Sequence, residues 1–438
     1  MGIALLKKLN THLPDSVKLA FAPIIRWNLI YNSVFQKHME ELNMMDNQTY
    51  AEIESTQFIK LKETLIHAYE HTKYYRNLFE EAGFDVYKFS AVDELHKIPV
   101  LTKQLITEHF EDLQADDIQD YYSATTGGST GEPLKVYLDR DSIYKEKAFI
   151  YHFWEKFGYD YKSSRLASFR GTNFGGRNFK ANPLYNEIQC NPCNINRDTI
   201  VEYYHRINKF GVTFLHGFPS AIYSFCKFAK EALLEIKNKY RAVFFVSENV
   251  YDFQRTFIEE TLGCPTAAFY GHSERAVFAE QLAGGREYCF NDYYGYWEIN
   301  DNSNIICTGF INRKMPLIRY ELDDIASKKG DRYEIIGHRD GILYGRNGEI
   351  ISTASMEVHS EKLNRIASYQ LQQKNKGDLI VRIIPIDDLS QKELDDLRMV
   401  FQNKAGAGLT VQIQPVKEML LTPRGKLKLL IQEVQQDI

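Results

Sequence analysis

Apolar residues recur at helical spacing through much of the first hundred residues. In residues 56–82 they return every three or four positions, as at Leu61 and Leu65, until Gly83 ends the pattern. This spacing predicts an amphipathic helix that packs against a core through one face. We therefore expect the N-terminal part of the chain, residues 1–120, to be mainly helical.

Beyond residue 120 helical segments alternate with short, apolar, β-rich runs. The expected strands lie in the segments RLASFRG, VTFLHGF, RAVFFVS and PTAAFYG. The expected helices lie around residues 141–157, in 201–210, from 220 onward and in 253–262. Alternation of this kind predicts an α/β sheet covered by helices.

From Tyr293 the pattern becomes strand-rich, which suggests a smaller β subdomain. Beyond Arg339 about a hundred residues combine the strands DLIVRIIP and LTVQIQP with a helix at 391–404. We predict a large N-terminal α/β domain with a β subdomain, plus a small mobile C-terminal α+β lid domain. The expected parts are residues 1–120, the helical portion of the large domain, 121–338, the α/β core with its β subdomain, and 339–438, the lid.

Composition narrows the class of protein. The 438 residues are 44% hydrophobic and 25% charged, as in a soluble globular protein, and the net charge is −5. No long basic stretch occurs, so we expect no nucleic-acid partner. Pro23 and Arg26 interrupt the apolar residues 17–35, so we expect no integral membrane association.

The cysteines indicate a reducing compartment. Six of them are scattered through the chain, so we expect a cytoplasmic protein without a signal peptide. Cys190 and Cys193 have the spacing of a zinc pair, but the sequence contains no second pair of that kind, and we infer no zinc site there.

A glycine-rich loop is the first candidate for chemistry. The stretch TTGGSTGEPLK, residues 125–135, combines backbone N–H groups that can point inward with hydroxyl donors, as a phosphate-binding loop requires. Glu132 and Pro133 follow Gly131, where a Walker A loop has lysine and a hydroxyl residue, so a kinase or motor ATPase is disfavoured. Taken alone, the loop could equally be an ordinary glycine-rich hairpin loop.

Further segments follow the loop in a fixed order. They are VSENV (246–250), FYGHSERAVFAE (269–280), KMPLIRYELDD (314–324), IIGHRDGILYGRNGE (336–349) and LTPRGKLK (421–428), with IPVLTK (98–103) ahead of the loop. Together the segments resemble the adenylate-forming, acyl-activating superfamily. The resemblance is to the branch of phenylacetate–CoA ligases and CapK-like proteins of capsular polysaccharide loci, and it covers nearly the whole chain.

The resemblance implies an ATP- and Mg²⁺-dependent ligase. Such an enzyme joins a small carboxylic or amino acid to ATP, releases pyrophosphate and forms an acyl-adenylate. It then passes the acyl group to CoA, a carrier protein or an amine such as an amino sugar. The ATP-binding residues that the resemblance implies are Thr125, Thr126, Gly127, Gly128, Ser129, Thr130, Gly131, Ser247, Glu248, Tyr270, Gly271, Ser273, Asp324, Arg339 and Arg346.

Individual roles follow from the same resemblance. Tyr270 would stack on adenine, and Ser273 would lie near the α-phosphate. Glu274 would hold Mg²⁺, because a hard cation prefers a carboxylate. Asp324 would accept from the ribose hydroxyls, although Asp323 stands where the family has glycine.

By the same resemblance, the C-terminal part would supply the hinge and the catalytic lysine. Asp340 falls at the family's hinge position, and His338 occupies the place of an arginine, with Arg339 one residue later. Lys426 matches the family's catalytic lysine, whose ammonium bridges the attacking carboxylate and the α-phosphate. Lys428 is its nearest competitor.

Two functions remain open at this point. The first is acid activation, with a role in capsule or O-antigen polysaccharide biosynthesis. The alternative is a catalytically weakened, nucleotide-binding relative that acts as a scaffold in polysaccharide assembly. The departures at Asp323, His338 and Gly341 keep the alternative open.

Overall fold

The structure is a computed structural model of the whole chain. It describes residues 26, 30–125, 134–170, 174, 176–248, 250, 252–281, 284–338, 342–346, 350–356, 361–405, 408–421 and 427–434. Among the helices in these ranges, none is both long enough and apolar enough to cross a membrane.

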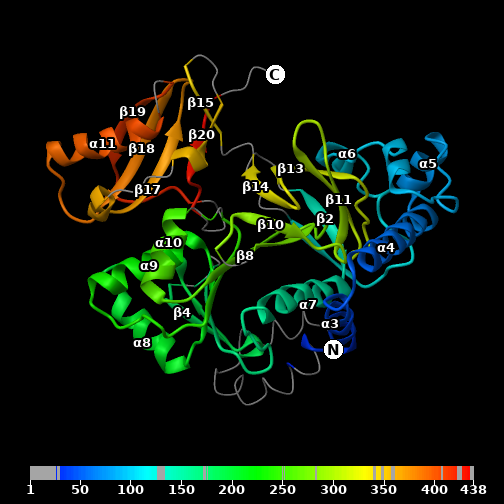
Figure 1. Cartoon of the computed structure of the whole chain (residues 1–438), viewed down its shortest axis with the longest axis horizontal. Helices are drawn as coiled ribbons and strands as arrows, with labels where there is room; N and C mark the ends of the chain where they lie inside the picture. Colours follow the sequence, from blue (N-terminus) through cyan, green and yellow to red (C-terminus); the bar gives the residue numbers. More distant parts are fainter. Residues whose placement is uncertain are drawn as a thin grey trace. The chain divides into compact units, whose positions relative to one another are not determined.

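The chain divides into two compact units. Unit 1 comprises Met1–Ser164, Ala181–Glu187 and Phe269–Ile335, and unit 2 comprises Arg165–Lys180, Ile188–Ala268 and Ile336–Ile438. Figure 1 shows the chain coloured along its sequence. The boundary between the units falls inside four strands, β4, β5, β8 and β14, whose bounds are given below.

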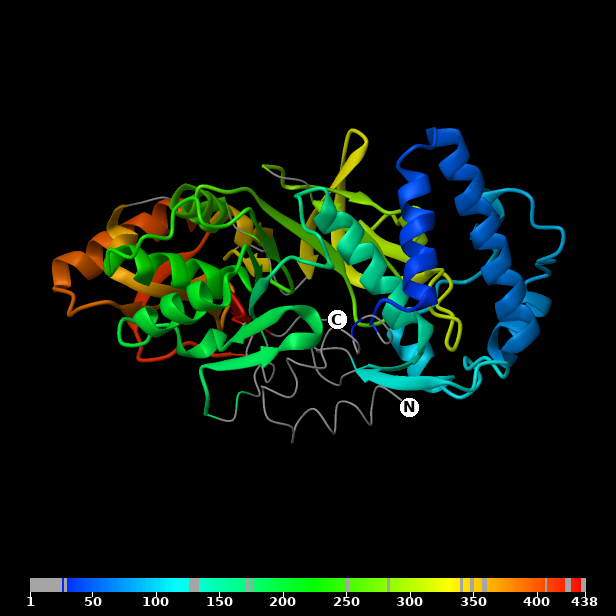
Figure 2. The ribbon, with the colours of Figure 1, turned by 90° about the horizontal axis from the view of Figure 1, so that it is seen from below.

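Unit 1 contains the helices of the N-terminal part together with two helical segments from later in the chain. They are α3 (Ser33–Met45), α4 (Tyr50–His71), α5 (Lys73–Glu81), η2 (Val92–Lys97), α6 (Lys103–Glu108), α7 (Asp141–Glu155) and η3 (Pro183–Tyr185). Helix α3 packs against α7, and the two run side by side in Figures 1 and 2. Between residues 30 and 120 the chain is mainly helical, in agreement with the expectation for the N-terminal part.

The helix predicted over residues 56–82 is in fact two helices. Thr72 lies between α4 and α5 in an extended conformation, with φ −124° and ψ 141°. Its hydroxyl donates to the Ala68 carbonyl (2.8 Å) and accepts from the Tyr75 amide (3.2 Å). One buried side chain therefore closes the first helix and caps the second. Because both helix ends keep a hydrogen-bond partner, the break has a small cost in free energy, although the apolar spacing continues through it.

The strands of unit 1 form a hairpin and an antiparallel sheet. The hairpin pairs β1 (Tyr121–Thr125) with β2 (Lys135–Asp139). The sheet has the order β11-β12-β13-β14-β10-β9-β8. Its strands are β8 (Thr266–Gly271), β9 (Phe278–Gln281), β10 (Glu287–Phe290), β11 (Gly295–Ile299), β12 (Asn304–Gly309), β13 (Tyr320–Lys329) and β14 (Arg332–His338).

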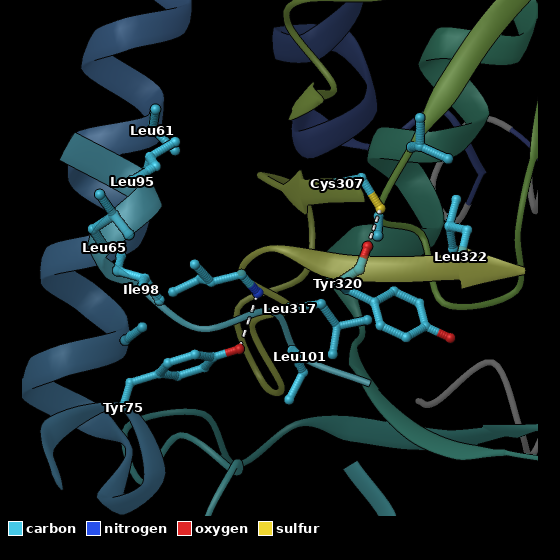
Figure 3. Close-up of a cluster of buried hydrophobic side chains, with 14 of the residues drawn as sticks. Leu61, Leu65, Tyr75, Leu95, Ile98, Leu101, Cys307, Leu317, Tyr320 and Leu322 are labelled. Atoms are coloured by element: carbon cyan, nitrogen blue, oxygen red, sulfur yellow. Dashed lines mark hydrogen bonds between the residues drawn. The ribbon is translucent and has the colours of Figure 1, made fainter. Parts of the chain in front are cut away.

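The core of unit 1 joins α4 and α5 to this sheet. Leu61 and Leu65 of α4 belong to one buried hydrophobic cluster with Leu317, Tyr320 and Leu322, residues that Figure 3 labels. The fully buried Tyr75 accepts a hydrogen bond from the Ile318 amide (2.9 Å), also drawn in Figure 3. The start of β13, the strand that carries the predicted site residue Asp324, is thus held from one side by the N-terminal helices.

Unit 2 begins with a parallel sheet. The order is β8-β7-β6-β3-β5-β4, and the β3–β6, β6–β7 and β7–β8 pairs are parallel. The strands are β3 (Leu166–Phe169), β4 (Phe179–Asn182), β5 (Glu187–Cys190), β6 (Phe214–Gly217) and β7 (Ala242–Phe245). The helices are η4 (Pro192–Asn194), α8 (Ile200–Phe210), α9 (Pro219–Glu231) and α10 (Asp252–Leu262).

Every strand and helix predicted for this α/β region is present. The strands β3, β6 and β7 are buried along their whole length, as expected for parallel strands covered on both faces. Gly217 ends β6 at φ 148°, where a Cβ would lie 2.4 Å from the Phe169 carbonyl oxygen. Only glycine allows the two strand ends to approach so closely.

The C-terminal part of unit 2 is a four-stranded sheet with one long helix. Its order is β19-β18-β17-β20, with β17 and β18 antiparallel and the outer pairs parallel. The elements are β15 (Ile342–Tyr344), β16 (Ile350–Ser352), η6 (Thr353–Met356), η7 (Glu361–Arg365), β17 (Ile366–Gln373), β18 (Asp378–Pro385), α11 (Gln391–Ala405), β19 (Thr410–Pro415) and β20 (Leu430–Gln432). Leu397 and Phe401 of α11 pack on this sheet (Figure 1), so the predicted α+β character is confirmed.

Candidate active site

Strand β13 separates the two adjacent aspartates. Its side chains alternate between buried and partly exposed from Tyr320 onward, so Tyr320, Leu322 and Asp324 share the buried face. Asp324 is 3% exposed, whereas the Asp323 side chain is 41% exposed and points to the opposite face. The strand period, rather than the nearness of the two residues in sequence, decides which carboxylate enters the buried cluster.

A β-bulge lies at the same place. Asn304 of β12 pairs with Ile325, but Ile306, two residues later, pairs with Glu321, four residues earlier on β13. The three residues from Leu322 to Asp324 therefore face one residue of β12. Strand β13 thus has two more residues than β12 at the bulge. Because two is an even number, side chains continue to alternate between the two faces of the sheet through the bulge. Bulges often re-aim side chains beside functional sites.

Asp324 is contacted by two side chains of the turn after β8. The Tyr270 hydroxyl donates to Asp324 Oδ2 at 2.6 Å. His272 Nε2 lies 2.6 Å from the Tyr270 hydroxyl and 3.0 Å from the same Asp324 oxygen. Since the tyrosine proton is directed at the carboxylate, His272 Nε2 faces two acceptors, the Asp324 carboxylate and the tyrosine oxygen, and a proton on this nitrogen is shared between them.

The protonation states agree with this order of donors. Burial and the neighbouring Asp324 charge raise the pKa of the Tyr270 hydroxyl, which keeps it a donor. Burial alone would lower the pKa of His272, but the hydrogen bond to Asp324 and its charge outweigh burial, so the pKa of His272 is raised. The cluster is therefore a buried carboxylate held by one neutral and one readily protonated donor.

Glu274 lies beside this cluster. It is 4% exposed, and its Oε1 accepts from the Tyr320 hydroxyl at 3.1 Å. In the part of the chain that the structure describes, its second oxygen has no hydrogen-bond partner. A buried carboxylate with an oxygen to spare is the kind of ligand that Mg²⁺ takes, so the residue present fits the cation that the resemblance implies.

Asp323, the departure from the family pattern, has a partner of its own. Lys103 Nζ contacts Asp323 Oδ2 in a partly exposed ion pair. Arg319 binds Glu298 (3.1 Å) and donates to the Ile98 carbonyl, which ties residues 98–103 to the start of β13. Three segments that carry the resemblance, 98–103, 269–280 and 314–324, therefore meet within unit 1.

Two further segments meet within unit 2. Ser247 adopts a left-handed φ of 67°, which is rare for serine and marks a constrained turn. The following Glu248 accepts from the Ser220 amide at the start of α9 (3.2 Å) and from the Leu427 amide (3.1 Å). The segment 246–250 is thus joined to the residue that directly follows Lys426.

A buried glutamine holds the same C-terminal segment. Gln370 of β17 is fully buried, and its amide donates to the carbonyls of Leu420 (2.9 Å) and Lys428 (2.7 Å). Its oxygen accepts from the Leu420 amide (3.2 Å), and Leu421 and Leu427 form a β-bridge. One side chain therefore fastens both ends of the segment 421–427, which includes Lys426 in its sequence.

Several predicted site residues lie outside the described part of the chain. They are Thr126, Gly127, Gly128, Ser129, Thr130, Gly131, Arg339, Asp340 and Lys426. Of the rest, Thr125 ends β1, and Gly271 and Ser273 are exposed beside Tyr270. The exposed Arg346 donates to the Thr410 hydroxyl (2.8 Å). The roles of all these residues stay predictions.

The sequence did not single out three side chains that the structure connects to the site. His272 lies two residues after Tyr270, within the segment 269–280 that carries the resemblance, so its position in the sequence could have indicated a role in the site. Lys103 likewise ends the quoted segment 98–103, but its partner Asp323 is distant in sequence. Gln370 lies in no quoted segment, and its partners at Leu420 and Lys428 are also distant.

Comparison with known proteins identifies the class from the fold. The chain superimposes on a crystal structure of 2-hydroxyisobutyryl-CoA ligase in the postadenylation state with 2-HIB-AMP, with a TM-score of 0.67, 16% identity, and coverage of 88% of this chain and 90% of that chain. An open conformation of the same ligase with 2-HIB-AMP and CoA gives a TM-score of 0.51, 16% identity and coverage of 86% and 91%. The fold is that of the adenylate-forming CoA ligases.

The sequence comparisons point to a particular branch. Residues 343–433 match the family model of the CapK C-terminal domain. The chain is 22% identical to Protein CapK of Staphylococcus aureus over 394 residues, which are 84% of this chain and 86% of that protein. Over 105 residues, 24% of each protein, it is 30% identical to phenylacetate-coenzyme A ligase of Escherichia coli (strain K12). The resemblance to the adenylate-forming superfamily and its CapK-like branch is confirmed.

Proposed function

We propose that this protein is an ATP-dependent ligase that activates a carboxylic or amino acid as an acyl-adenylate and releases pyrophosphate. The observation that carries the proposal is the buried cluster of Tyr270, His272 and Asp324 beside Glu274. A preorganised carboxylate next to an aromatic ring suits a ribose diol and an adenine. The fold of the adenylate-forming CoA ligases supports this assignment.

In this proposal Asp324, rather than Asp323, accepts from the ribose. Asp324 is buried and oriented by Tyr270 and His272, whereas Asp323 is paired with Lys103 on the other face of β13. Glu274 would hold Mg²⁺, which screens the triphosphate charges when bound. Residues 125–131 would hold the β- and γ-phosphates, and Lys426 would neutralise charge at the α-phosphate as the carboxylate attacks.

The second half-reaction transfers the acyl group to a thiol or amine. The ligase matched in the comparison was crystallised with CoA, which supports a thiol acceptor. A carrier protein or an amino sugar remains part of the proposal, as does a contribution to capsule or O-antigen polysaccharide synthesis, which the similarity to Protein CapK supports. Asp340 would be the hinge of a C-terminal lid, residues 339–438.

Pyrophosphate exchange tests the proposal. Purified protein with Mg²⁺·ATP and a panel of carboxylic and amino acids should exchange labelled pyrophosphate into ATP with at least one acid. Lys426→Ala should reduce the exchange on the order of a hundredfold to a thousandfold, and Lys428→Ala should change it little. Absence of exchange across a broad panel, without ATP binding, would contradict the proposal. Thermal stabilisation by ATP without turnover would favour the scaffold alternative.

A further inference from the structure

Two histidines and an aspartate, none of them used in the proposed function, converge at the end of α4. His67 and His71 occupy positions i and i+4 of α4, on one face of the helix, with their rings 5.0 Å apart. Asp117, from the segment that leads into β1, brings its carboxylate against both. The facing atoms of the three side chains all lie within 4.8 Å of one another.

The distances are close to those of a tetrahedral metal site. His67 Nε2 is 3.1 Å from Asp117 Oδ1, and His71 Nε2 is 3.9 Å from Asp117 Oδ2. Ligand atoms bound to one zinc ion at about 2.0–2.1 Å are roughly 3.3 Å apart. The first pair already has this separation, and the second needs to close by roughly half an ångström, which a side-chain rotation provides.

A second carboxylate orients one of the histidines. Asp116 Oδ1 lies 2.9 Å from His71 Nδ1, and the Asp116 amide donates to the His71 carbonyl (3.0 Å). A proton on Nδ1, held by Asp116, leaves the lone pair of His71 on Nε2, directed toward Asp117. Metal-binding histidines are commonly fixed in this way by a carboxylate on the other ring nitrogen.

One charge opposes cation binding. Arg313 Nη2 is 3.8 Å from Asp117 Oδ2, but the arginine side chain is 53% exposed, so it can turn into solvent. Without a metal, His67 Nε2 lies 3.1 Å from Asp117 Oδ1. A neutral imidazole carries one proton, so metal binding at Nε2 would require the tautomer of His67 with that proton on Nδ1.

We propose that His67, His71 and Asp117 form a binding site for a divalent transition metal of the zinc class, with a fourth position open to water. Imidazole and carboxylate ligands suit Zn²⁺ and Co²⁺ better than Mg²⁺ or Ca²⁺. The ion would fasten the end of α4 to the segment that leads into β1 and the glycine-rich loop. This site does not depend on the proposed ligase activity.

Metal titration of the full chain, prepared without an affinity tag and treated with a chelator, tests the site. Isothermal titration calorimetry should give one Zn²⁺ per chain, and Co²⁺ should produce a visible absorption band typical of four-coordinate geometry. His71→Gln and Asp117→Asn should each weaken Zn²⁺ binding more than tenfold. Asp116→Asn, which removes only the orienting carboxylate, should weaken it about tenfold.

Two further variants guard against misfolding and nonspecific binding. Arg313→Gln should tighten Zn²⁺ binding severalfold, because it removes the opposing charge, and a misfolded protein would not show such a gain. His96→Gln changes an exposed histidine that lies 4.0 Å from Glu298, and it should leave the affinity unchanged. Zn²⁺ binding below one equivalent in the wild type, or binding equal in wild type, His71→Gln and Asp117→Asn, would overturn the site.

Discussion

Two polar arrangements, one in each unit, are satisfied in different ways. In unit 1, His272 lies against an opposite charge, the carboxylate of Asp324, and its pKa is raised. In unit 2, Lys227 of α9 donates to a backbone carbonyl, that of Ile366, and burial lowers its pKa to about 8. Gln370 and Glu248 likewise bind backbone groups.

The difference separates two uses of a buried polar group. A charged side chain paired with another side chain keeps a particular protonation state and shapes a binding cluster. A substitution that removes one of the two charges should therefore disturb the cluster. A side chain that binds backbone groups holds a segment that is distant in sequence. A substitution that removes its hydrogen bonds should therefore release that segment. The first arrangement suits the proposed nucleotide contacts, and the second suits the segment that contains Lys426.

The largest effect should come from removing the charge in unit 1. Asp324→Asn should reduce kcat/KM for ATP in pyrophosphate exchange about a hundredfold, because two hydrogen bonds to a charged group contribute roughly 3 kcal/mol. The matched control Asp323→Asn disrupts only a partly exposed ion pair and should cost less than about fivefold. Equal losses, or a greater loss in the control, would reassign the ribose contact.

The next effect should come from releasing the C-terminal segment in unit 2. Gln370→Met should lower adenylation about tenfold or more through misplacement of Lys426, and transfer from pre-made acyl-adenylate should stay within about twofold. Gln373 is the matched control, since it is also fully buried on β17 and bonds two carbonyls and one amide, those of Tyr344 and Asp378.

Both glutamine variants should lower the free energy of unfolding similarly, by about 2 kcal/mol, because each leaves buried backbone groups without partners. Denaturant titration of both variants, beside pyrophosphate release, separates stability from positioning. If Gln373→Met impairs adenylation as much as Gln370→Met, the effect is one of stability and the positioning role of Gln370 is wrong.

We expect the contribution of Lys227 to stability to increase with pH. Its folded pKa of about 8 lies below the ordinary 10.5, so the unfolded chain binds more protons between these values. The contribution of Lys227 to the free energy of unfolding should therefore rise with pH across this window, by at most about 1.4 kcal/mol per pH unit. Lys227→Met should remove this rise in denaturant titrations, whereas Lys230→Met, an exposed change on the same helix, should keep it.

The smallest effect is expected at His272, whose contribution to stability should decrease as the pH rises. Its folded pKa lies above the ordinary 6.5, so its stabilising contribution is complete below that pH and is lost as pH rises through the folded pKa. The unfolding free energy of the wild type should therefore exceed that of His272→Gln by an amount that decreases as the pH rises. A difference that grows with pH would contradict the Asp324 pairing.

The periodic segments of the sequence were enough to predict much of the fold. The strands β3, β6, β7 and β8 and the helices between them are regular segments whose apolar spacing matches their burial. The break at Thr72 was missed because helical spacing continues across it, and capping by one threonine hydroxyl leaves no periodic trace. Strand β17 was missed because buried glutamines interrupt its apolar pattern.

The candidate site was predictable where residues are neighbours in sequence and less so elsewhere. Tyr270 and Glu274 belong to one segment, and Asp324 to another, so the resemblance could indicate all three. The contacts of Lys103 with Asp323 and of Glu248 with Leu427 join residues more than 170 positions apart. Such pairs depend on how strands are ordered in the sheet, which local patterns do not encode.

The bulge in β13 has a consequence for how such chains are recognised. A motif search locates a residue by its distance in sequence from Tyr320, whereas its position in the sheet depends on which residue of β12 it pairs with. The two differ by two residues here, because Leu322, Asp323 and Asp324 face a single residue of β12. A relative without the bulge could present its carboxylate at the same point in space from a different place in its sequence. Searches for the ribose-binding residue in this branch should therefore allow a gap of variable length after the tyrosine and require only that the carboxylate share its face of the strand.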